Sequence, residues 1–507
     1  MRQESYIATL FIRLLTIVYL LTQMNSSTQP TIIVGAGFTG LFTALHLRHQ
    51  RDLRSLILID PQERFVFKPM LYERLTGELS EDTVCPTYDE LLQGSDINFV
   101  QDKVMAIDLK EKRLTLASGK DYIYSCLVLA VGSVQGYLGA EGAQANTFAF
   151  RTRENAIALE RQLHDCLQCA SQTKDEQQRR SLLTFAVVGA GPTGVEMAAT
   201  LADLLPSWYA QLNGDIHEIR VVLINHGKTI LAGDVNESLQ EDALHAFKTR
   251  TVPVELILGV GVKAVDADHL EYQLANSTET KTLLTQTTIW TAGTAVNPLI
   301  QSLKSQIQSD HLDKHGLPLV TPTLQLLDFP GVFAAGDCAD VQQQPQPALA
   351  QVAYQQGATI AHNLSALAKG ESLSSAKVHL RGTLMKLGLN NGVANLFDEM
   401  QVTGKPGDLI RNATYLEMLP TPLHDFKATL EWLKEEIFHR YHRPKLESGT
   451  TAKQLLSPAE KRERAIVKAL AILAPIAFLI AAYFGLRTPK SEQIGHLQPN
   501  STMQTTP

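Results

Sequence analysis

Two glycine-rich turns carry the clearest chemical signal in this chain. Gly35, Gly37 and Gly40 form a Gly-x-Gly-x-x-Gly pattern, with Ala36 inside it, directly after the apolar run 31–34 and before an Ala- and Leu-rich stretch. In such a turn the first glycine permits a tight bend, the second lets the backbone approach a pyrophosphate, and the third lets a helix pack close to a strand. The dipole of that helix favours phosphate at its N-terminus. The pattern therefore predicts a dinucleotide site.

The same pattern returns about 150 residues later, at Gly189, Gly191 and Gly194, between the apolar run 182–188 and a second helical stretch. One such fingerprint can arise by chance, whereas two complete copies in the same strand-turn-helix context form a much stronger signal. They predict two dinucleotides and two Rossmann-like domains of the α/β class.

The residue that ends the next strand distinguishes the two copies. The run 55–59 ends in Asp60, about 20 residues after the first glycine turn, where an acid can bind ribose hydroxyls. The matching run 220–224 ends in Asn225, followed by His226. The first predicted site therefore has its ribose acid and the second lacks one.

Composition narrows the class of protein. The chain has 507 residues, enough for two to four domains, and a net charge of −7, so no broad basic field suggests a nucleic-acid partner. Five scattered cysteines fit a reducing compartment better than a disulfide framework. No metal-binding pattern stands out, and we predict none.

Two apolar stretches bear on location. The uncharged run 469–486 would reach about 27 Å as a helix, close to the thickness of a bilayer core. Basic residues before it favour the catalytic domains on the cytoplasmic side. We predict a membrane helix over 465–487; a helix lying in the membrane interface remains the alternative. The run 6–21 is also apolar, but Arg13 interrupts it, and we interpret residues 1–28 as an extension outside the mature fold.

Three further segments lead to a family. They are Gly336-Asp337 after an apolar run, the helical stretch Ala350-Gln351-Val352-Ala353-Tyr354-Gln355, and the segment 67–72, Phe-Lys-Pro-Met-Leu-Tyr. Together with the two fingerprints, they resemble the flavoproteins with two dinucleotide-binding domains. Within these, the chain is similar to the type II NADH:quinone oxidoreductases, which are single-subunit respiratory dehydrogenases that do not pump protons.

The resemblance implies an FAD domain that is interrupted by an NAD(P)H domain. The boundaries that we expect are an FAD domain over 29–151 and 291–368, an NAD(P)H domain over 152–290, a C-terminal domain over 369–460, the membrane-associated segment and a polar tail over 488–507.

The resemblance also assigns roles to residues. The candidates for binding non-covalent FAD are Gly35, Ala36, Gly37, Gly40, Asp60, Lys68, Val104, Gly336, Asp337, Ala350 and Gln351. Gly189, Gly191 and Gly194 would bind NADH or NADPH, and Gly293 is a further cofactor-binding candidate. The catalytic candidates are Glu196, Gln351 and Gln355. The plainer interpretation of Glu196 is an exposed first-turn glutamate favoured by the helix dipole, and that of Gln355 is an ordinary polar helix position.

The implied activity is hydride transfer from NADH to flavin, followed by two-electron reduction of a membrane quinone. Asn225 removes the repulsion of a 2′-phosphate without supplying an arginine clamp, so NADPH remains open as a donor. The resemblance leaves a homodimer open as well.

Other classes compete with this interpretation. Cys166 and Cys169 form a C-x-x-C pair loosely where thioredoxin reductases carry their redox disulfide, although the surrounding residues predict an exposed helix. A sulfide:quinone oxidoreductase would use a cysteine in the C-terminal part, and none follows Cys338. A flavoprotein redox sensor without enzyme activity is the third alternative.

Overall fold

The computed structural model describes residues 29–429 apart from 53, 234, 275–276, 381, 397–399, 422–423 and 426. The predicted N-terminal extension 1–28, the predicted membrane helix 465–487 and the polar tail 488–507 lie outside the described residues. Among the residues that are described, no helix has the length and apolar character needed to cross a bilayer.

A five-stranded parallel sheet carries the first glycine turn. Its strand order is β18-β7-β1-β2-β3, with β1 at Thr31–Val34, β2 at Leu56–Asp60, β3 at Asn98–Gln101, β7 at Cys126–Leu129 and β18 at Val332–Ala334. The central strands are apolar and buried, as expected for a parallel sheet covered on both faces. Strand β18 joins β7 from more than 200 residues further along the chain, so this sheet is assembled from two separate segments.

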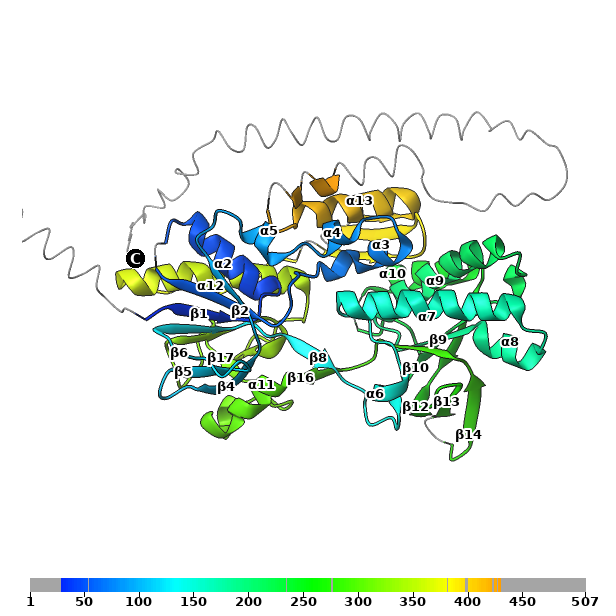
Figure 1. Cartoon of the computed structure of the whole chain (residues 1–507), viewed down its shortest axis with the longest axis horizontal. Helices are drawn as coiled ribbons and strands as arrows, with labels where there is room; N and C mark the ends of the chain where they lie inside the picture. Colours follow the sequence, from blue (N-terminus) through cyan, green and yellow to red (C-terminus); the bar gives the residue numbers. More distant parts are fainter. Residues whose placement is uncertain are drawn as a thin grey trace, which may run out of the picture. The chain divides into compact units, whose positions relative to one another are not determined.

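Two long helices cover one face of this sheet, and a small antiparallel sheet lies across from them (Figure 1). Helix α2 (Phe38–His49) packs on α12 (Ala350–Lys369), where the hydroxyl of Thr43 donates to the Gly357 carbonyl at 3.1 Å. A Cβ atom on Gly357 would lie 2.7 Å from the carbonyl oxygen of Thr39, so only glycine allows this approach. The antiparallel strands are β4 (Val104–Asp108), β5 (Arg113–Leu116) and β6 (Asp121–Ile123).

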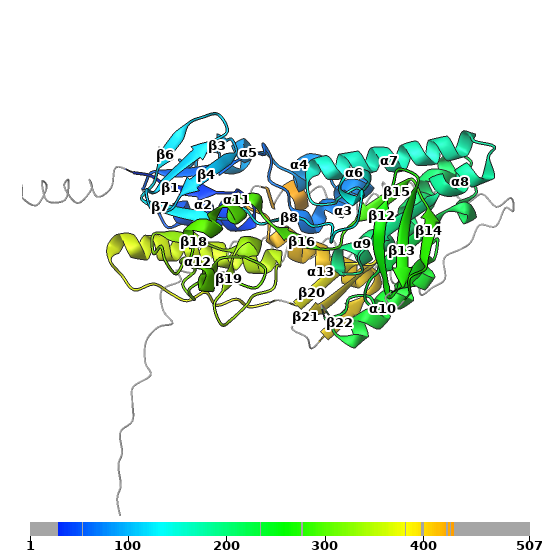
Figure 2. The same ribbon diagram turned by 90° about the horizontal axis from the view of Figure 1, so that it is seen from below.

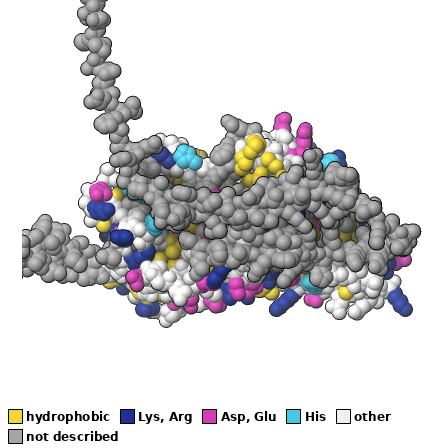
Figure 3. Space-filling view, turned by 90° about the horizontal axis from the view of Figure 1, so that it is seen from above, with side chains coloured by type: hydrophobic (Ala, Val, Ile, Leu, Met, Phe, Trp, Pro, Cys, Tyr) yellow, Lys and Arg dark blue, Asp and Glu magenta, His cyan; other side chains and the backbone are white. Residues whose placement is uncertain are grey.

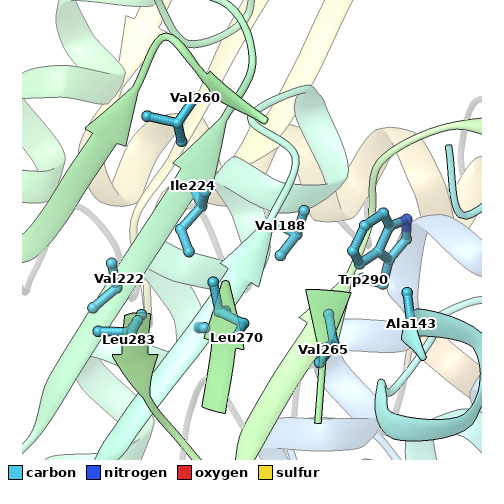
Figure 4. Packing of buried hydrophobic residues seen from close by; sticks show 10 residues of the cluster. Ala143, Val188, Val222, Ile224, Val260, Val265, Leu270, Leu283 and Trp290 are labelled. Carbon is cyan, nitrogen blue, oxygen red and sulfur yellow. The ribbon is translucent and has the colours of Figure 1, made fainter. Parts of the chain in front are cut away.

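A four-stranded parallel sheet carries the second glycine turn. Its order is β11-β10-β9-β15, with β9 at Thr184–Val188, β10 at Arg220–Asn225, β11 at Val254–Leu258 and β15 at Thr287–Trp290. Helices α7 (Arg153–Gln172) and α9 (Pro192–Gln211) lie on one side of it, and the antiparallel strands β12 (Val260–Val265), β13 (His269–Leu274) and β14 (Thr280–Leu284) lie on the other (Figure 1). Val188, Ile224 and Trp290 pack there against Val265 and Leu270 (Figure 4).

The chain passes from the first parallel sheet to the second and later returns, and the two connecting segments pair with each other at this crossing. Strand β8 (Ser133–Gln135) runs antiparallel to β16 (Thr294–Val296), with Val134 opposite Ala295. The mixed α/β architecture with two Rossmann-like sheets that the sequence predicts is therefore confirmed.

A further antiparallel sheet follows in the chain, and we call it the third sheet because it comes after the two parallel sheets. Its strands are β20 (Gly382–Lys386), β21 (Gly392–Leu396) and β22 (Met400–Thr403), and the helix α13 (Gly404–Glu417) follows them (Figure 2). The remaining elements are short or peripheral: α3 (Leu71–Thr76), α4 (Glu81–Val84), α5 (Tyr88–Leu92), α6 (Ala143–Asn146), α8 (Glu176–Leu182), α10 (Glu237–Thr249), α11 (Pro298–Ser302), β17 (Leu319–Val320), β19 (Asp340–Val341) and the 3-10 turns η1 (Lys68–Met70), η2 (Ile216–Glu218), η3 (Leu303–Gln306), η4 (Ser309–His311) and η5 (Gly336–Cys338). Acidic and basic side chains are interspersed along the visible edges of the face in Figure 3.

Candidate functional site

The first glycine turn has a distinct steric reason for each glycine. Gly35 has φ +94°, and a Cβ atom there would lie 2.5 Å from the Ala130 carbonyl oxygen. A Cβ atom on Gly37 would meet nothing within 4 Å, whereas one on Gly40 would lie 1.8 Å from the Gly35 oxygen. The first and third glycines are thus required by the fold, and the space at the second is open for a ligand. This open cradle at the N-terminus of α2 fits a pyrophosphate.

The second glycine turn repeats this geometry. Gly189 has φ +106°, and a Cβ atom there would lie 2.8 Å from the Ala292 nitrogen. A Cβ atom on Gly194 would lie 1.8 Å from the Gly189 oxygen, the same distance as in the first turn. Gly191 caps α9 in an extended conformation, with Pro192 at the first helical position. The second turn therefore offers a cradle of the same kind.

Asp60, at the carboxyl end of β2, is bonded to the first turn. Its Oδ2 accepts the Ala36 N–H at 2.7 Å, and its Oδ1 accepts the Gln62 N–H at 2.8 Å. Burial raises the pKa of this carboxyl, and the two N–H donors oppose that rise. The hydroxyl of Tyr88 donates to the Ala36 carbonyl at 2.9 Å and holds the turn from the other side. A cavity of about 230 Å³ is lined by residues that follow Asp60 in the chain, including Pro61, Gln62 and Arg64.

Asn225 occupies the corresponding place at the end of β10. Its Oδ1 accepts the Ala190 N–H at 3.2 Å, as Asp60 does for Ala36. Its Nδ2 donates to the carbonyls of Thr229, at 3.0 Å, and Gly227, at 3.4 Å. The amide therefore holds the loop after β10 as well as the glycine turn.

Asp337, Ser133 and Arg151 lie together at the carboxyl ends of the first sheet. The Ser133 hydroxyl donates to Asp337 Oδ2 at 3.0 Å, and Arg151 Nη2 donates to the Ser133 oxygen at 2.7 Å. Burial and then the charge of Arg151 lower the pKa of the Lys68 ammonium, and the charge of Asp337 raises it. Part of the Lys68 side chain is nevertheless open to solvent. Lys68 and Asp337, which lie far apart in the sequence, are thus brought together. Ser133 and Arg151 were missed, because neither belongs to a recognisable motif.

The Gly336-Asp337 turn is fixed by a glutamine that the sequence analysis did not single out. Gly336 has φ +72°, and its N–H donates to Gln356 Oε1 at 2.8 Å. Cys338 is buried beside them, and burial raises the pKa of its thiol to about 11. The only hint in the sequence that Gln356 contributes to the site was its position directly after Gln355.

Gln351 and Gln355 both bond the chain segment that follows α12. Gln351 Nε2 donates to the Gly382 carbonyl at 3.2 Å. Gln355 forms two hydrogen bonds with the backbone of His379. Its Nε2 donates to the His379 carbonyl at 3.0 Å, and its Oε1 accepts the His379 N–H at 2.9 Å. Ala350 is the first residue of α12, in the same turn as Gln351.

Glu196 is the fifth residue of α9, and its side chain is only 13% exposed. Its Oε1 accepts the Lys386 N–H at 2.8 Å and lies 3.9 Å from Arg411 Nε. Burial raises the pKa of the Glu196 carboxyl to about 7, against the lowering effect of Arg411. The plainer interpretation, an exposed first-turn glutamate, does not fit this burial.

The remaining candidates lie on separate elements. Val104 is buried at the start of β4. Gly293, with φ +73°, lies between β15 and β16, and its carbonyl accepts a bond from Gln135 Nε2 at 3.0 Å. Cys166 is buried in α7 and Cys169 is exposed, and both are free thiols. Among the described residues, no group of three His, Cys, Asp or Glu side chains could hold a metal ion.

The sequence profile of the pyridine nucleotide-disulphide oxidoreductases matches residues 29–357, which is well over half of the chain. The chain belongs to this family. Demethylphylloquinone reductase NdbB of Synechocystis is 30% identical over 421 residues, which cover 81% of this chain and 97% of that protein. The type II NADH:quinone oxidoreductase of Staphylococcus aureus is 26% identical over 390 residues, which cover 75% and 93%. The resemblance to the type II NADH:quinone oxidoreductases is therefore confirmed.

Solved structures agree at the level of the fold. The structure of NDH2 from Plasmodium falciparum in complex with NADH has a TM-score of 0.74 at 19% identity and covers 82% of this chain and 99% of its own. The sulfide:quinone oxidoreductase of Aquifex aeolicus has a TM-score of 0.62 at 18% identity and covers 76% and 90%. Both reductase classes share this family fold, so the choice between their activities depends on the residues of the site.

Proposed function

We propose that this protein is a membrane-bound FAD enzyme that transfers a hydride from NADH to flavin and then two electrons to a membrane quinone, without pumping protons. The observation that carries the proposal is the pair of glycine cradles in a chain whose relatives include a demethylphylloquinone reductase and a type II NADH:quinone oxidoreductase. The buried, hydrogen-bonded Cys338 and the separated environments of Cys166 and Cys169 favour this activity over thiol chemistry.

Non-covalent FAD would be held by the first cradle. Bound there, it supplies an acceptor for a hydride and a donor of two electrons. Gly35, Ala36, Gly37 and Gly40 would bind its pyrophosphate through the backbone, and Asp60 its ribose. On the flavin side, the candidates are Lys68, Val104, Gly336, Asp337, Ala350 and Gln351. The charges of Lys68, Arg151 and Asp337 at the sheet edge give this side both donors and acceptors.

The nicotinamide dinucleotide would be held by Gly189, Gly191 and Gly194, with Gly293 at the neighbouring crossing. Asn225 presents no negative charge to a 2′-phosphate, so both NADH and NADPH can approach this strand end. NADH is the donor that we propose as preferred, because no arginine follows Asn225 in the turn to bind a phosphate.

Quinone reduction is the role that we assign to Glu196, Gln351 and Gln355. A quinone takes up two protons with its two electrons, and a carboxyl whose pKa is about 7 can both hold and release a proton near neutral pH. The side-chain amides of Gln351 and Gln355 donate to the backbone carbonyls of Gly382, at the start of β20, and of His379 before it, and this segment would shape the quinone entrance.

The membrane is the place that we propose for this reaction. A membrane quinone requires a lipid-bound enzyme, and the predicted helix over 465–487 would attach the catalytic domains to the cytoplasmic side of the bilayer. The proposed division is an FAD domain over 29–151 and 291–368, an NAD(P)H domain over 152–290 and a C-terminal domain over 369–460. A homodimer is part of the proposal only as an assembly to be measured.

The decisive experiment uses the full-length protein in membranes. NADH should bleach the bound flavin, and a soluble quinone analogue should restore its absorbance with steady turnover. Bleaching without quinone turnover would favour the redox sensor. Turnover driven by sulfide, and not by NADH, would favour the sulfide:quinone activity.

A further inference from the structure

A buried charge cluster lies outside the two glycine cradles. It consists of Glu73 on α3, Glu78 directly after α3, Lys386 at the end of β20, and Asp408 and Arg411 on α13. Each of these five residues is at most 8% exposed. The cluster thus connects the segment after the first cradle with the third sheet and its helix, which lie beside α3 and α9 in Figures 1 and 2.

The two cations of the cluster share one carboxylate. Lys386 Nζ donates to Glu73 Oε1 at 2.9 Å and also pairs with Glu78. Arg411 Nη1 donates to the same Glu73 oxygen at 2.7 Å, and Arg411 Nη2 donates to the Pro69 carbonyl at 2.7 Å. Pro69 follows Lys68, so the guanidinium is anchored directly on the segment that we assign to the flavin side.

The remaining nitrogen of the guanidinium faces Glu196. Arg411 Nε is buried and has no hydrogen-bond partner among the described residues, and it lies 3.9 Å from Glu196 Oε1. The same carboxylate oxygen accepts the Lys386 N–H at 2.8 Å. One guanidinium therefore connects three elements: η1, α3 and α9, which follows the second glycine cradle.

Stability alone is a weak reason for such a cluster. The cost of removing several charges from water often equals or exceeds their attraction, and apolar residues of similar volume commonly stabilise a fold as well. The bonds that Arg411 does make are directional, because it donates to Glu73 and to the Pro69 carbonyl, and they fix the direction in which its Nε faces. The placement of Arg411 therefore points to a role in fixing the groups that it joins.

We propose that Arg411 is a positioning residue for Glu196: with the Lys386 backbone N–H, it holds this carboxylate between α9 and the segment 68–73, so that the third sheet and α13 complete the candidate site. The functional importance of Arg411 rests on the proposed function, because there Glu196 takes part in quinone reduction. The placement itself can be tested without any turnover.

The charges around Glu196 determine what the test should show. The groups that face it are Tyr72 and Glu73 from α3, Lys386 from β20, and Arg411 and Tyr415 from α13. Burial raises the pKa of the Glu196 carboxyl. The positive charges of Arg411 and Lys386 lower this pKa, and the negative charge of Glu73 raises it. Removal of the Arg411 charge should therefore raise the pH at which Glu196 loses its proton.

The test is an infrared pH titration of the full-length flavoprotein without NADH or quinone. The carboxyl band that Glu196→Gln removes identifies Glu196. An opposite charge at this distance shifts a carboxyl pKa by about 1 to 3 units, so Arg411→Met should move the midpoint of this band upward by about one pH unit or more. Arg411→Lys, which retains the charge without the fork, should give a smaller shift.

Arg250→Met is the matched control. Arg250 is only 10% exposed, pairs with Asp203 at 3.0 Å and supports the turn after β20, but it is not among the groups that face Glu196. Its replacement should leave the midpoint unchanged. Equal midpoints in Arg411→Met and Arg250→Met would overturn the proposal, as would a spectrum from which Glu196→Gln removes no titrating band.

A second variant keeps the test open if Arg411→Met does not fold. Glu73→Gln removes a neighbouring negative charge, so it should lower the Glu196 midpoint, and an unchanged or raised midpoint would contradict the proposed arrangement. Quinone turnover is measured separately on the same samples. If the wild-type protein shows no quinone turnover, the proposed function is overturned, while the titration still decides the placement of Glu196.

Discussion

The two glycine cradles have the same backbone geometry but different residues at the end of the next strand. In both, the side chain after the strand accepts the N–H of the alanine inside the turn, from Ala36 to Asp60 and from Ala190 to Asn225. Asp60 places a negative charge at its cradle. Asn225 is neutral, and its amide N–H groups donate to the carbonyls of Gly227 and Thr229. The strand-end residue thus has two separable tasks: it holds the turn, and it selects the ribose by charge.

The two helices also differ at their fifth residues. Two residues after the third glycine, α9 carries Glu196, and α2 carries Phe42 at the same position. Glu196 is held by the third sheet and α13, whereas Phe42 packs in the core against Tyr354. The helix after the first cradle is therefore fixed at this position by apolar packing, and the second cradle has an ionisable group at its edge.

The largest expected effect separates the two cradles by their third glycines. Gly40→Ala should yield protein without bound flavin, and Gly194→Ala should yield flavin-containing protein that NADH does not bleach, because the added Cβ atom would overlap the first glycine of its own turn. Flavin absorbance per protein and anaerobic bleaching measure both losses. Gly331→Ala, where the nearest atom would lie at 3.7 Å, is the control. Loss of flavin in both variants would mean that the cradles do not bind separate nucleotides.

The next effect converts the first strand end into the second. Asp60→Asn can retain the bond from Ala36 but removes the charge, and a lost charge-assisted hydrogen bond costs about 1.5 to 3 kcal/mol. We therefore expect FAD affinity to fall about ten- to a hundredfold with little change in the fold. Fluorescence titration of the deflavinated protein with FAD measures it. An unchanged affinity would show that Asp60 serves the turn alone.

The ionisable edge of the second cradle predicts a pH effect on stability. The pKa of Glu196 rises from 4.5 in the unfolded chain to about 7 in the fold, so between these values the folded protein holds a proton that the unfolded chain has released. The free energy of unfolding should fall as the pH rises through this window, by up to about 3 kcal/mol. Glu196→Gln should flatten this fall in denaturant titrations, and Glu154→Gln, at an exposed first-turn glutamate of α7, should not.

The smallest effect converts the second strand end into the first. Asn225→Asp adds a negative charge that would repel a 2′-phosphate, so kcat/KM for NADPH should fall about tenfold while that for NADH is retained or improved. Steady-state rates with both donors measure the ratio. If the NADH and NADPH values fall equally, the loss of the bonds to Gly227 and Thr229 matters more than the charge.

Much of the fold could be predicted because its signals are local. Each strand, glycine turn and helix start occupies consecutive residues, and steric demands within the turn leave glycine as the only residue at its first and third positions. Asp60 could be identified for the same reason, since its place depends on one strand and one turn. The proposed roles of Glu196, Gln351 and Gln355 required the family resemblance and remain predictions.

The sequence by itself determined that two dinucleotide cradles exist and that only the first has a ribose acid. Only the tertiary structure decided which distant residues complete them. Gln356 holds the Gly336 turn, Ser133 joins Arg151 to Asp337, and Arg411 reaches Glu196 across more than 200 positions of sequence. Such contacts leave no periodic or spaced pattern, because they arise where separate elements pack and a buried charge must find its partner.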